Sequence, residues 1–294
     1  MADETVKLSA QVKLLNDFIF KRCLGRRGQE PALEAFVNAL MIENGDEPVT
    51  NIEILNDVII TPDNIEGKVG VLDIKAKTLD GKKVINIEIQ LRDTDNMFSR
   101  STFYESALFT EKDVIKSGEK FEDMPRVITI NILDYHSKEF KSKNFRKCFE
   151  EVDRVEGLDV MKLKQKNFIE LPKFRAMDNF DLENALHRWL LYFDYQTDPE
   201  LKKEVIKMDT DIQLVETAYQ NILLDPQEME IYRLHMKYER NRISSENYLK
   251  EKAAKEAEQK KAEETARNML EDNVPLEKIK KWTGLCEEEI LNLM

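Results

Sequence analysis

Apolar residues recur at helical spacing near the start of the chain and at strand spacing soon afterwards. Segments 12–25 and 30–43 place apolar side chains three and four residues apart, which predicts two amphipathic helices. In 51–60 apolar and polar residues alternate, which predicts a strand. A helical pattern over 94–118 and a β-branched run over 126–135 then predict a helix followed by a strand covered on both faces.

The second half of the chain is mainly helical in its pattern. A strand pair is expected around 145–152 and 166–174, and amphipathic helices follow from residue 180. Segment 228–270 contains neither Pro nor Gly, and its later half is mostly Ala, Lys and Glu, which favours a long exposed helix. The predicted organisation is a core over 1–175, a helical subdomain over 176–225 packed on it, a long helix over 226–270, and a helical pair over 271–294.

A hairpin is the strongest short-range prediction. Asp80-Gly81 stands between two alternating segments and is the preferred sequence of a two-residue hairpin turn. Such a turn fixes the register, because the numbers of opposing residues then sum to 161, and Asp73 falls opposite Glu88. One face of this hairpin carries Leu72, Ile74, Ala76, Ile85, Ile87 and Ile89 and belongs on a core. The other face carries Val71, Asp73, Lys75, Asn86, Glu88 and Gln90.

The two opposed carboxylates of Asp73 and Glu88 suggest a metal site. Directly opposed residues of an antiparallel pair have Cβ atoms about 5 Å apart, so two carboxylates there repel unless one is protonated or a cation lies between them. Oxygen ligands, with the amide of Gln90 two residues on, suit Mg²⁺ or Mn²⁺ better than zinc. The alternative interpretation is an ordinary solvated strand face, where Asp and Glu are common.

Composition narrows the class of protein. The formal charge of −12 disfavours a generally basic DNA-coating protein, although a local basic groove is compatible with it. The three cysteines are far apart and form no zinc motif, so they are expected to be reduced thiols of a cytoplasmic protein. No apolar run is long enough to cross a membrane, and the first residues do not have the pattern of a signal peptide.

The order of these elements and motifs resembles a known nuclease family. The resemblance is carried by "NDFIFKRCLG", "KVGVLDIKAKTLDGKKVINIEIQ", "RSTFYESALFTEKDVIKSGEKFEDMPRVITINIL", "FIELPKF" and "ARNMLEDNVPLEKIKKWTGLCEEEILNL". Together these segments resemble the Rpn-like branch of the PD-(D/E)XK nucleases, the recombination-promoting nucleases or PD-(D/E)XK nuclease family transposases. The resemblance implies an α/β fold: a restriction-endonuclease-like core, with a mixed central sheet flanked by helices, followed by an α-helical C-terminal region.

The resemblance also implies roles for individual residues. Asp73 and Glu88 match the acids of the second and third strands, which hold the metal, and Asp17 resembles the N-terminal acid that completes the metal shell. Gln90 stands where the superfamily usually has a catalytic lysine, so a lysine from elsewhere, Lys75 or Lys68, is a candidate replacement. For Asp17 the alternative is an exposed helix residue or a helix cap.

The implied activity is Mg²⁺-dependent hydrolysis of DNA by an endonuclease, possible settings being recombination, mobile elements or defence. Arg92 and Arg100 follow the third strand and are the candidate contacts to DNA phosphates. The alternatives are a catalytically weak or inactive nuclease-fold module that binds DNA or protein, and an assembly protein built on the long helix. A homodimer through the C-terminal helices is also expected, because the apolar residues there look too few for a core of their own. These residues are Trp282, Leu285, Ile290 and Leu293.

Overall fold

The fold is described from a computed structural model of the 294-residue chain. It describes residues 12–55, 74–93, 96–109, 120–156 and 162–293. The chain forms two compact units, residues 1–235 and residues 236–294, and the boundary between them lies within one long helix. Each unit is considered by itself below.

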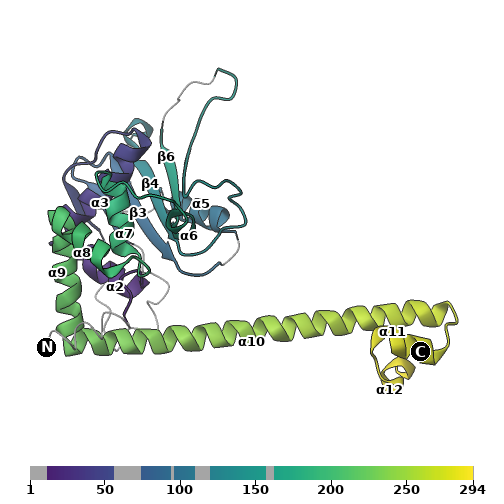
Figure 1. Ribbon diagram of the computed structural model, residues 1–294. Coiled ribbons are helices and arrows are strands. Elements are labelled where there is room, and N and C mark those ends of the chain that lie inside the picture. The colour runs from purple at the N-terminus through teal and green to yellow at the C-terminus, as the bar shows by residue number, and fades with distance from the viewer. Residues whose placement is uncertain (1–11, 56–73, 94–95, 110–119, 157–161, 294) are drawn as a thin grey trace. The chain divides into compact units, whose positions relative to one another are not determined.

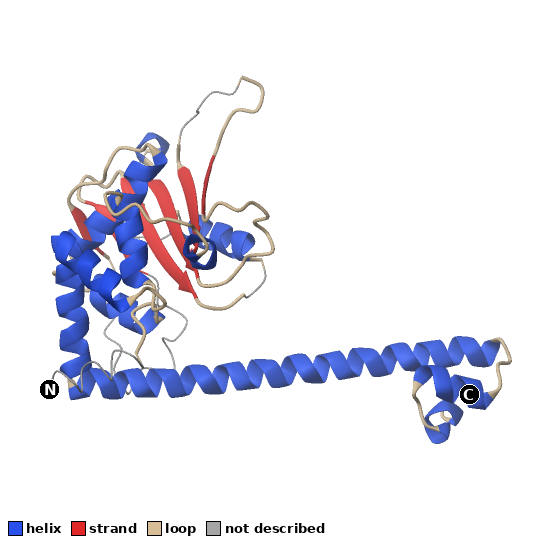
Figure 2. Cartoon of the chain, viewed as in Figure 1, coloured by secondary structure: helices blue, strands red, loops and turns tan. Residues whose placement is uncertain are grey.

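A mixed six-stranded sheet is the centre of the first unit, as Figure 2 shows in red. The strands are β1 (Ile52–Ile54), β2 (Ile74–Thr78), β3 (Lys83–Gln90), β4 (Arg126–Leu133), β5 (Arg146–Glu150) and β6 (Lys164–Glu170). Their order in the sheet is β1-β2-β3-β4-β6-β5. The inner pairs β3–β4 and β4–β6 are parallel, whereas the other pairs are antiparallel. The predicted mixed sheet flanked by helices is therefore confirmed.

Helices cover the two faces of the sheet unequally (Figure 1). The helices of the first unit are α2 (Asp17–Leu24), α3 (Glu30–Asn44), α5 (Met97–Leu108), α6 (Leu171–Arg175), α7 (Ala185–Phe193), α8 (Pro199–Met208) and α9 (Thr210–Leu224), with a short 3₁₀ turn at Phe121–Asp123. Helices α2, α3 and α7 pack on the face that carries the Ile residues of β3 and β4, and α5 packs on the other face. The larger core therefore lies on the side away from α5.

The hairpin register is as expected wherever the structure describes it. Ile74 pairs with Ile87, Lys75 with Asn86, Ala76 with Ile85, and Lys77 with Val84. Gly81 at the turn has a φ of 72°, the left-handed conformation that glycine adopts without steric cost. Ile85 and Ile87 are buried in the main core and Ile89 is partly buried against it. The side chains at 84, 86, 88 and 90 consequently face α5.

Helix α2 begins later than the apolar pattern alone indicates. Asn16 is the N-cap, and its side-chain oxygen accepts hydrogen bonds from the backbone N–H groups of Phe18 (3.1 Å) and Ile19 (3.4 Å). The helix ends before Gly25, where a Cβ atom would lie 3.0 Å from Cγ1 of Ile74. A glycine there lets the end of α2 lie close against β2. The helix expected over 94–118 is described only as Met97–Leu108, since 110–119 lie outside the described residues.

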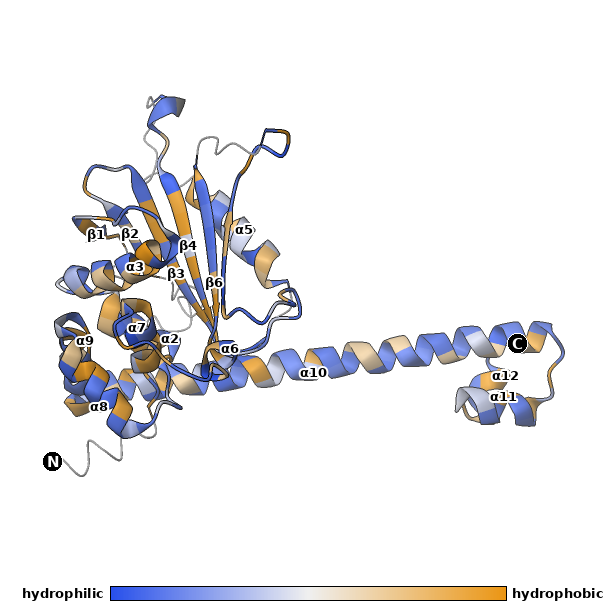
Figure 3. Ribbon diagram, turned by 45° about the horizontal axis from the view of Figure 1, so that its top comes forward, coloured by the Kyte–Doolittle hydropathy of each residue, from blue (hydrophilic) through white to orange (hydrophobic). Residues whose placement is uncertain are grey.

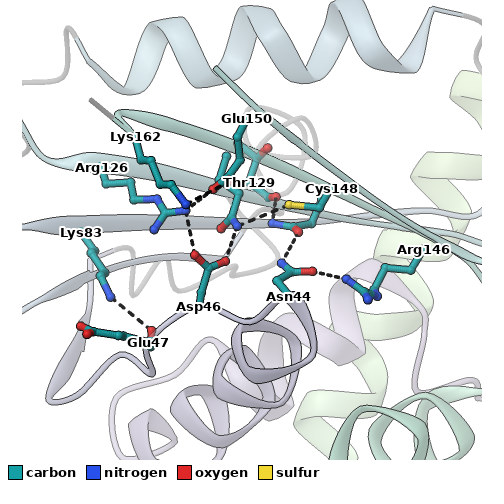
Figure 4. A network of polar contacts seen from close by, with 12 residues as sticks. Asn44, Asp46, Glu47, Lys83, Arg126, Thr129, Arg146, Cys148, Glu150 and Lys162 are labelled. Carbon is teal, nitrogen blue, oxygen red and sulfur yellow. Dashed lines mark hydrogen bonds and ion pairs between the residues drawn. The ribbon is translucent and has the colours of Figure 1, made fainter. Parts of the chain in front are cut away.

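A polar network ties the end of α3 to the far edge of the sheet (Figure 4). Asn44 donates to Oδ1 of the fully buried Asn167 on β6 (2.8 Å), and Arg146 on β5 donates to Asn44. Gln165 on β6 donates to Asp46 (2.6 Å), which also pairs with Arg126. Asn167 and Gln165 on the core face of β6 thus bond to α3 and to the residues after it, which fixes that helix relative to the sheet.

The second unit has a small apolar core of its own. It contains the end of α10 (Pro226–Glu271), α11 (Leu276–Thr283) and α12 (Glu287–Leu291). The buried residues are Ala266 of α10 with Ile279, Leu285 and Ile290, and Leu293 packs partly against them. Leu285, Ile290 and Leu293 thus pack with α10 of the same chain, and the homodimer predicted from the sequence stays a prediction. Trp282 stays 65% exposed.

The hydropathy colouring of Figure 3 shows α10 mostly hydrophilic along its length. Among the residues that the structure describes, none of the helices has both the length and the apolar composition needed to cross a bilayer.

Candidate active site

Glu88 lies on the α5 face of the sheet, near the carboxyl end of the central strand β3. The residue is only 4% exposed, and it pairs in parallel register with Asn131 of β4. A buried carboxylate is costly unless positive charge and hydrogen bonds surround it. The partners of Glu88 therefore decide what this part of the sheet can do.

Arg100 of α5 supplies positive charge to Glu88. Its Nη2 atom lies 2.7 Å from Oε1 of Glu88, and the guanidinium remains 38% exposed. The guanidinium carbon Cζ of Arg100 also lies over the ring of Tyr104, 5.4 Å from the ring centroid. An arginine carries five N–H donors in a planar fork, so one can hold a carboxylate while others reach a ligand. The structure thus gives Arg100 a carboxylate partner in addition to the DNA contact predicted for it.

Gln90 is the second neighbour of Glu88. Its Nε2 atom donates to the same Oε1 atom at 3.2 Å. Because residues two apart on a strand share a face, this contact follows directly from the strand geometry. Gln90 is half-buried at the last position of β3, where the strand opens toward the following loop. The amide therefore orients the carboxylate without adding charge.

Lys75 shares this face, one strand away. It lies on β2 opposite Asn86, and its side chain is half-buried. Asp73, predicted opposite Glu88, and Lys68 lie outside the described residues, so their predicted roles remain predictions. The confirmed register ends at the Ile74–Ile87 pair, one residue before the predicted pairing of Asp73 with Glu88.

Asp17 has a different partner from the one that the resemblance implies. Its Oδ1 atom accepts from the backbone N–H of Phe18 at 2.9 Å and lies 3.4 Å from Nε2 of His235. His235 is fully buried and stacks on the ring of Phe18 at 5.3 Å. Among the described residues, no three His, Cys, Asp or Glu side chains are grouped to hold a metal. The place of Asp17 in a metal site remains a prediction.

Arg92 follows β3 directly and its side chain is exposed. It lies in the segment that leads from Gln90 to α5, the same region as Arg100. Its predicted contact with DNA is compatible with this exposure and remains a prediction.

Further polar side chains of the sheet lie under α5, beyond Glu88 and Gln90. The hydroxyl oxygen of Ser101 on α5 lies 3.3 Å from the hydroxyl oxygen of Thr129. It also accepts a hydrogen bond from Nδ2 of Asn131 at 3.1 Å. One turn later, Glu105 is fully buried and pairs with Nζ of Lys166 on β6 at 2.5 Å. Helix α5 therefore docks on the sheet through paired charges and hydroxyls as well as through apolar residues.

The pattern analysis missed Tyr135, which joins this group from the segment after β4. It packs, partly buried, against the small apolar cluster on the α5 side, which consists of Met97, Leu133, Phe140 and Phe168. Burial, followed by the carboxylates of Asp93 and Glu139, raises the pKa of the Tyr135 hydroxyl to about 12, with a smaller contribution from Glu88 in the same direction and an opposing one from Arg100. The signal in the sequence was the polar ending of "NILDY".

One family model matches this chain, and it is described as PD-(D/E)XK nuclease family transposase. The match covers residues 14–249, which include all the predicted site residues and the strands of the sheet. Comparison with curated proteins gives no match, and comparison with solved structures gives none either.

The pairing of Glu88 with Arg100 leads to a stability prediction. Arg100→Gln leaves the buried carboxylate without its cation, so we expect the free energy of unfolding to fall. The loss should be about 1–3 kcal/mol, less than for a fully buried pair because Arg100 is more than a third exposed. In urea unfolding at neutral pH, the double variant Glu88→Gln/Arg100→Gln should lose less than the sum of the single variants.

Arg92→Gln is the matched control, because Arg92 is an exposed arginine in the segment between β3 and α5. It should leave the unfolding midpoint unchanged. Additive losses in the double-mutant cycle would mean that the ion pair does not stabilise the folded protein.

Proposed function

Because the chain belongs to the PD-(D/E)XK nuclease family transposases, we propose that it is a divalent-metal-dependent endonuclease that hydrolyses phosphodiester bonds in DNA. The observation that carries the proposal is the buried Glu88 on the polar face of the central strand, bonded to Gln90 and Arg100. An apolar residue there would be cheaper for stability, so a buried carboxylate at this position indicates a chemical role.

In this proposal Asp73 and Glu88 are ligands of Mg²⁺ or Mn²⁺, and Asp17 is a third candidate ligand. Carboxylate oxygens are the donors these ions prefer, so the residue types are suitable. A bound divalent ion supplies a water of lowered pKa and neutralises charge on the phosphate. The protein's own residues hold that ion, orient the carboxylates and bind the phosphate.

Gln90, Lys75 and the two arginines have distinct proposed roles. Gln90 orients Glu88 and a water through its amide, and Lys75 is the candidate replacement for the usual lysine of the third strand. Arg100 pairs with the carboxylate of Glu88 and contacts a DNA phosphate with its exposed N–H groups. Arg92 adds a second phosphate contact. The proposed setting is recombination, mobile elements or defence in the cytoplasm, in line with three free cysteines.

Nicking of a supercoiled plasmid tests the activity. Wild-type protein should nick the plasmid with Mg²⁺ or Mn²⁺ and not with EDTA. Glu88→Gln and Asp73→Asn keep the shape of the side chain but remove the charge that holds the ion. Each should slow nicking by about 100-fold or more, the order expected for losing one essential group.

Glu53→Gln is the control for this experiment. Glu53 is a half-exposed carboxylate on β1 of the same sheet, and its only described ion pair is a surface one with Lys77. It should nick like the wild type. DNA binding without metal-dependent nicking would instead favour the alternative function, a nuclease-fold module that binds DNA without cleaving it.

Gln90 is tested by two substitutions. Gln90→Ala should slow single-turnover cleavage by about 10-fold while DNA affinity, measured by fluorescence anisotropy in Ca²⁺, stays nearly constant, because the amide orients groups rather than holding the DNA. Gln90→Lys restores the usual superfamily residue and should retain or raise activity. An inactive Gln90→Lys protein would show that the site requires a neutral group there and takes its cation from elsewhere.

We also propose a homodimer, because cutting both strands of a duplex usually needs two active sites and we propose one site for this chain. On α11 and α12 the large apolar residues that are exposed are Trp282 and Leu291, and they are the proposed dimer surface. Light scattering at tens of micromolar should give twice the mass of 34.5 kDa for the full chain. Trp282→Ser should reduce the dimer, whereas Tyr248→Ser, an equally exposed aromatic on α10, should not. A monomeric wild type would remove the dimer from the proposal.

A further inference from the structure

Tyr135 is held at the candidate site from several sides. The preceding residue, Asp134, donates its backbone N–H to the carbonyl of Gln90 at 2.9 Å. The side chain of Asp134 pairs with Arg175 at 2.6 Å. Further along, the backbone N–H of Ser137 donates to buried Glu170 at 2.9 Å. The position of Tyr135 is thus fixed by β3, α6 and the end of β6.

The same segment also reaches α5. Glu139 accepts a hydrogen bond from the backbone N–H of Phe98, in the first turn of α5, at 3.0 Å. Arg100 follows in that turn. Residues 134–139 therefore connect the end of β3, which carries Gln90, to the helix that carries Arg100. Tyr135 lies on this connection and packs, partly buried, against the apolar cluster on the α5 side.

The hydroxyl of Tyr135 is a buried polar group that the folded chain does not satisfy. Its oxygen is inaccessible to solvent and has no hydrogen-bond partner among the residues that the structure describes. Other buried tyrosines differ, since Tyr192 donates to Glu216 at 3.0 Å and Tyr219 donates to the carbonyl of Val12 at 2.5 Å. A buried hydroxyl without a partner costs stability, and such groups occur where a ligand supplies the partner.

The charge state of this hydroxyl suits a donor. Its pKa is raised to about 12, chiefly by burial and by the carboxylates of Asp93 and Glu139. It therefore stays protonated at every pH near neutrality. A neutral O–H group donates to an anion without adding charge, and an O–H···O⁻ bond is stronger than one between neutral groups.

We propose that Tyr135 is a phosphate-binding residue of this site, whose hydroxyl donates to a non-bridging oxygen of the DNA phosphodiester held beside Glu88, Gln90 and Arg100. This inference rests on the proposed nuclease function and adds a specific contact to it. The phosphate then accepts hydrogen bonds from a charged donor, Arg100, and from a neutral donor, Tyr135. Because the hydroxyl is inaccessible in the DNA-free protein, the side chains that cover it move aside when the phosphate binds.

Tyr135→Phe tests the inference because it removes only the hydroxyl and keeps the ring in its apolar cluster. Binding is measured by fluorescence anisotropy with a fluorescein-labelled DNA duplex in Ca²⁺, which supports binding while limiting cleavage. We expect the Kd to rise about 3- to 10-fold, the loss of one hydrogen bond to a charged group. The melting temperature without DNA should stay the same or rise, because no hydrogen bond of the folded chain is lost.

Tyr192→Phe is the matched control. Its hydroxyl is bonded within the folded chain, so the variant should melt at a lower temperature and bind the duplex as the wild type does. The two tyrosines are thus expected to show opposite effects, one on DNA affinity and the other on stability. In single-turnover cleavage, Tyr135→Phe should need more enzyme for half-maximal rate.

Two results would overturn the inference while leaving the nuclease proposal intact. The first is wild-type affinity of Tyr135→Phe in a protein whose wild type binds and cuts DNA, as expected if the hydroxyl meets only water. The second is a lowered melting temperature with unchanged affinity, which would mean that the hydroxyl is bonded inside the fold. A wild type that neither binds nor cuts DNA would instead overturn the proposed function and this inference with it.

Discussion

The structure on the α5 face of the sheet depends on one constraint, the burial of the Glu88 carboxylate. A charge that is only 4% exposed must be matched by opposite charge close by, and Arg100 supplies it at 2.7 Å. Since Arg100 belongs to α5, that helix must lie over the middle of the sheet. The polar contacts of Ser101 and the Glu105–Lys166 pair extend the same docking toward β6. A helix placed largely by polar partners keeps a fixed position only if each of them is satisfied.

The apolar residues on the opposite face of the same strands stabilise the fold by their burial in the main core. Ile85 and Ile87 of β3 lie in the main core with the isoleucines of β4 and the helices α2, α3 and α7. Because successive side chains of a strand alternate between faces, residues 85 and 87 anchor the backbone that positions 88 and 90. Polar groups on a rigid strand keep their geometry better than the same groups on a loop. Burial of the apolar face of β3 therefore offsets the cost of burying polar side chains on its other face.

Sequence patterns were sufficient where the determining contacts are local. The Asp80-Gly81 turn set the register of β2 and β3, and the β-branched run of β4 showed a strand buried on both faces. Contacts between segments that are distant in the sequence could not be predicted from such patterns. Examples are the pairs Arg100–Glu88 and Asp17–His235, and the position of Tyr135 beside the end of β3. The small core of the second unit was also missed, because alanines of α10 gave no recognisable apolar stripe in a charged segment. Asp73, the predicted partner of Glu88, lies outside the described residues.

The charges around Glu88 determine what glutamine contributes at position 90. A lysine there would place a second cation beside Oε1 of Glu88, which Arg100 already contacts. Gln90 contacts the same oxygen with a neutral amide, so the positive charge at Oε1 comes from Arg100. Substitution of Gln90 by lysine would keep a donor at this position and add a second positive charge near the phosphate, and that is the change that Gln90→Lys tests. In the proposed nuclease, the positive charge usually supplied from the third strand is then supplied by the helix that follows it, and the position of α5 becomes part of the chemistry.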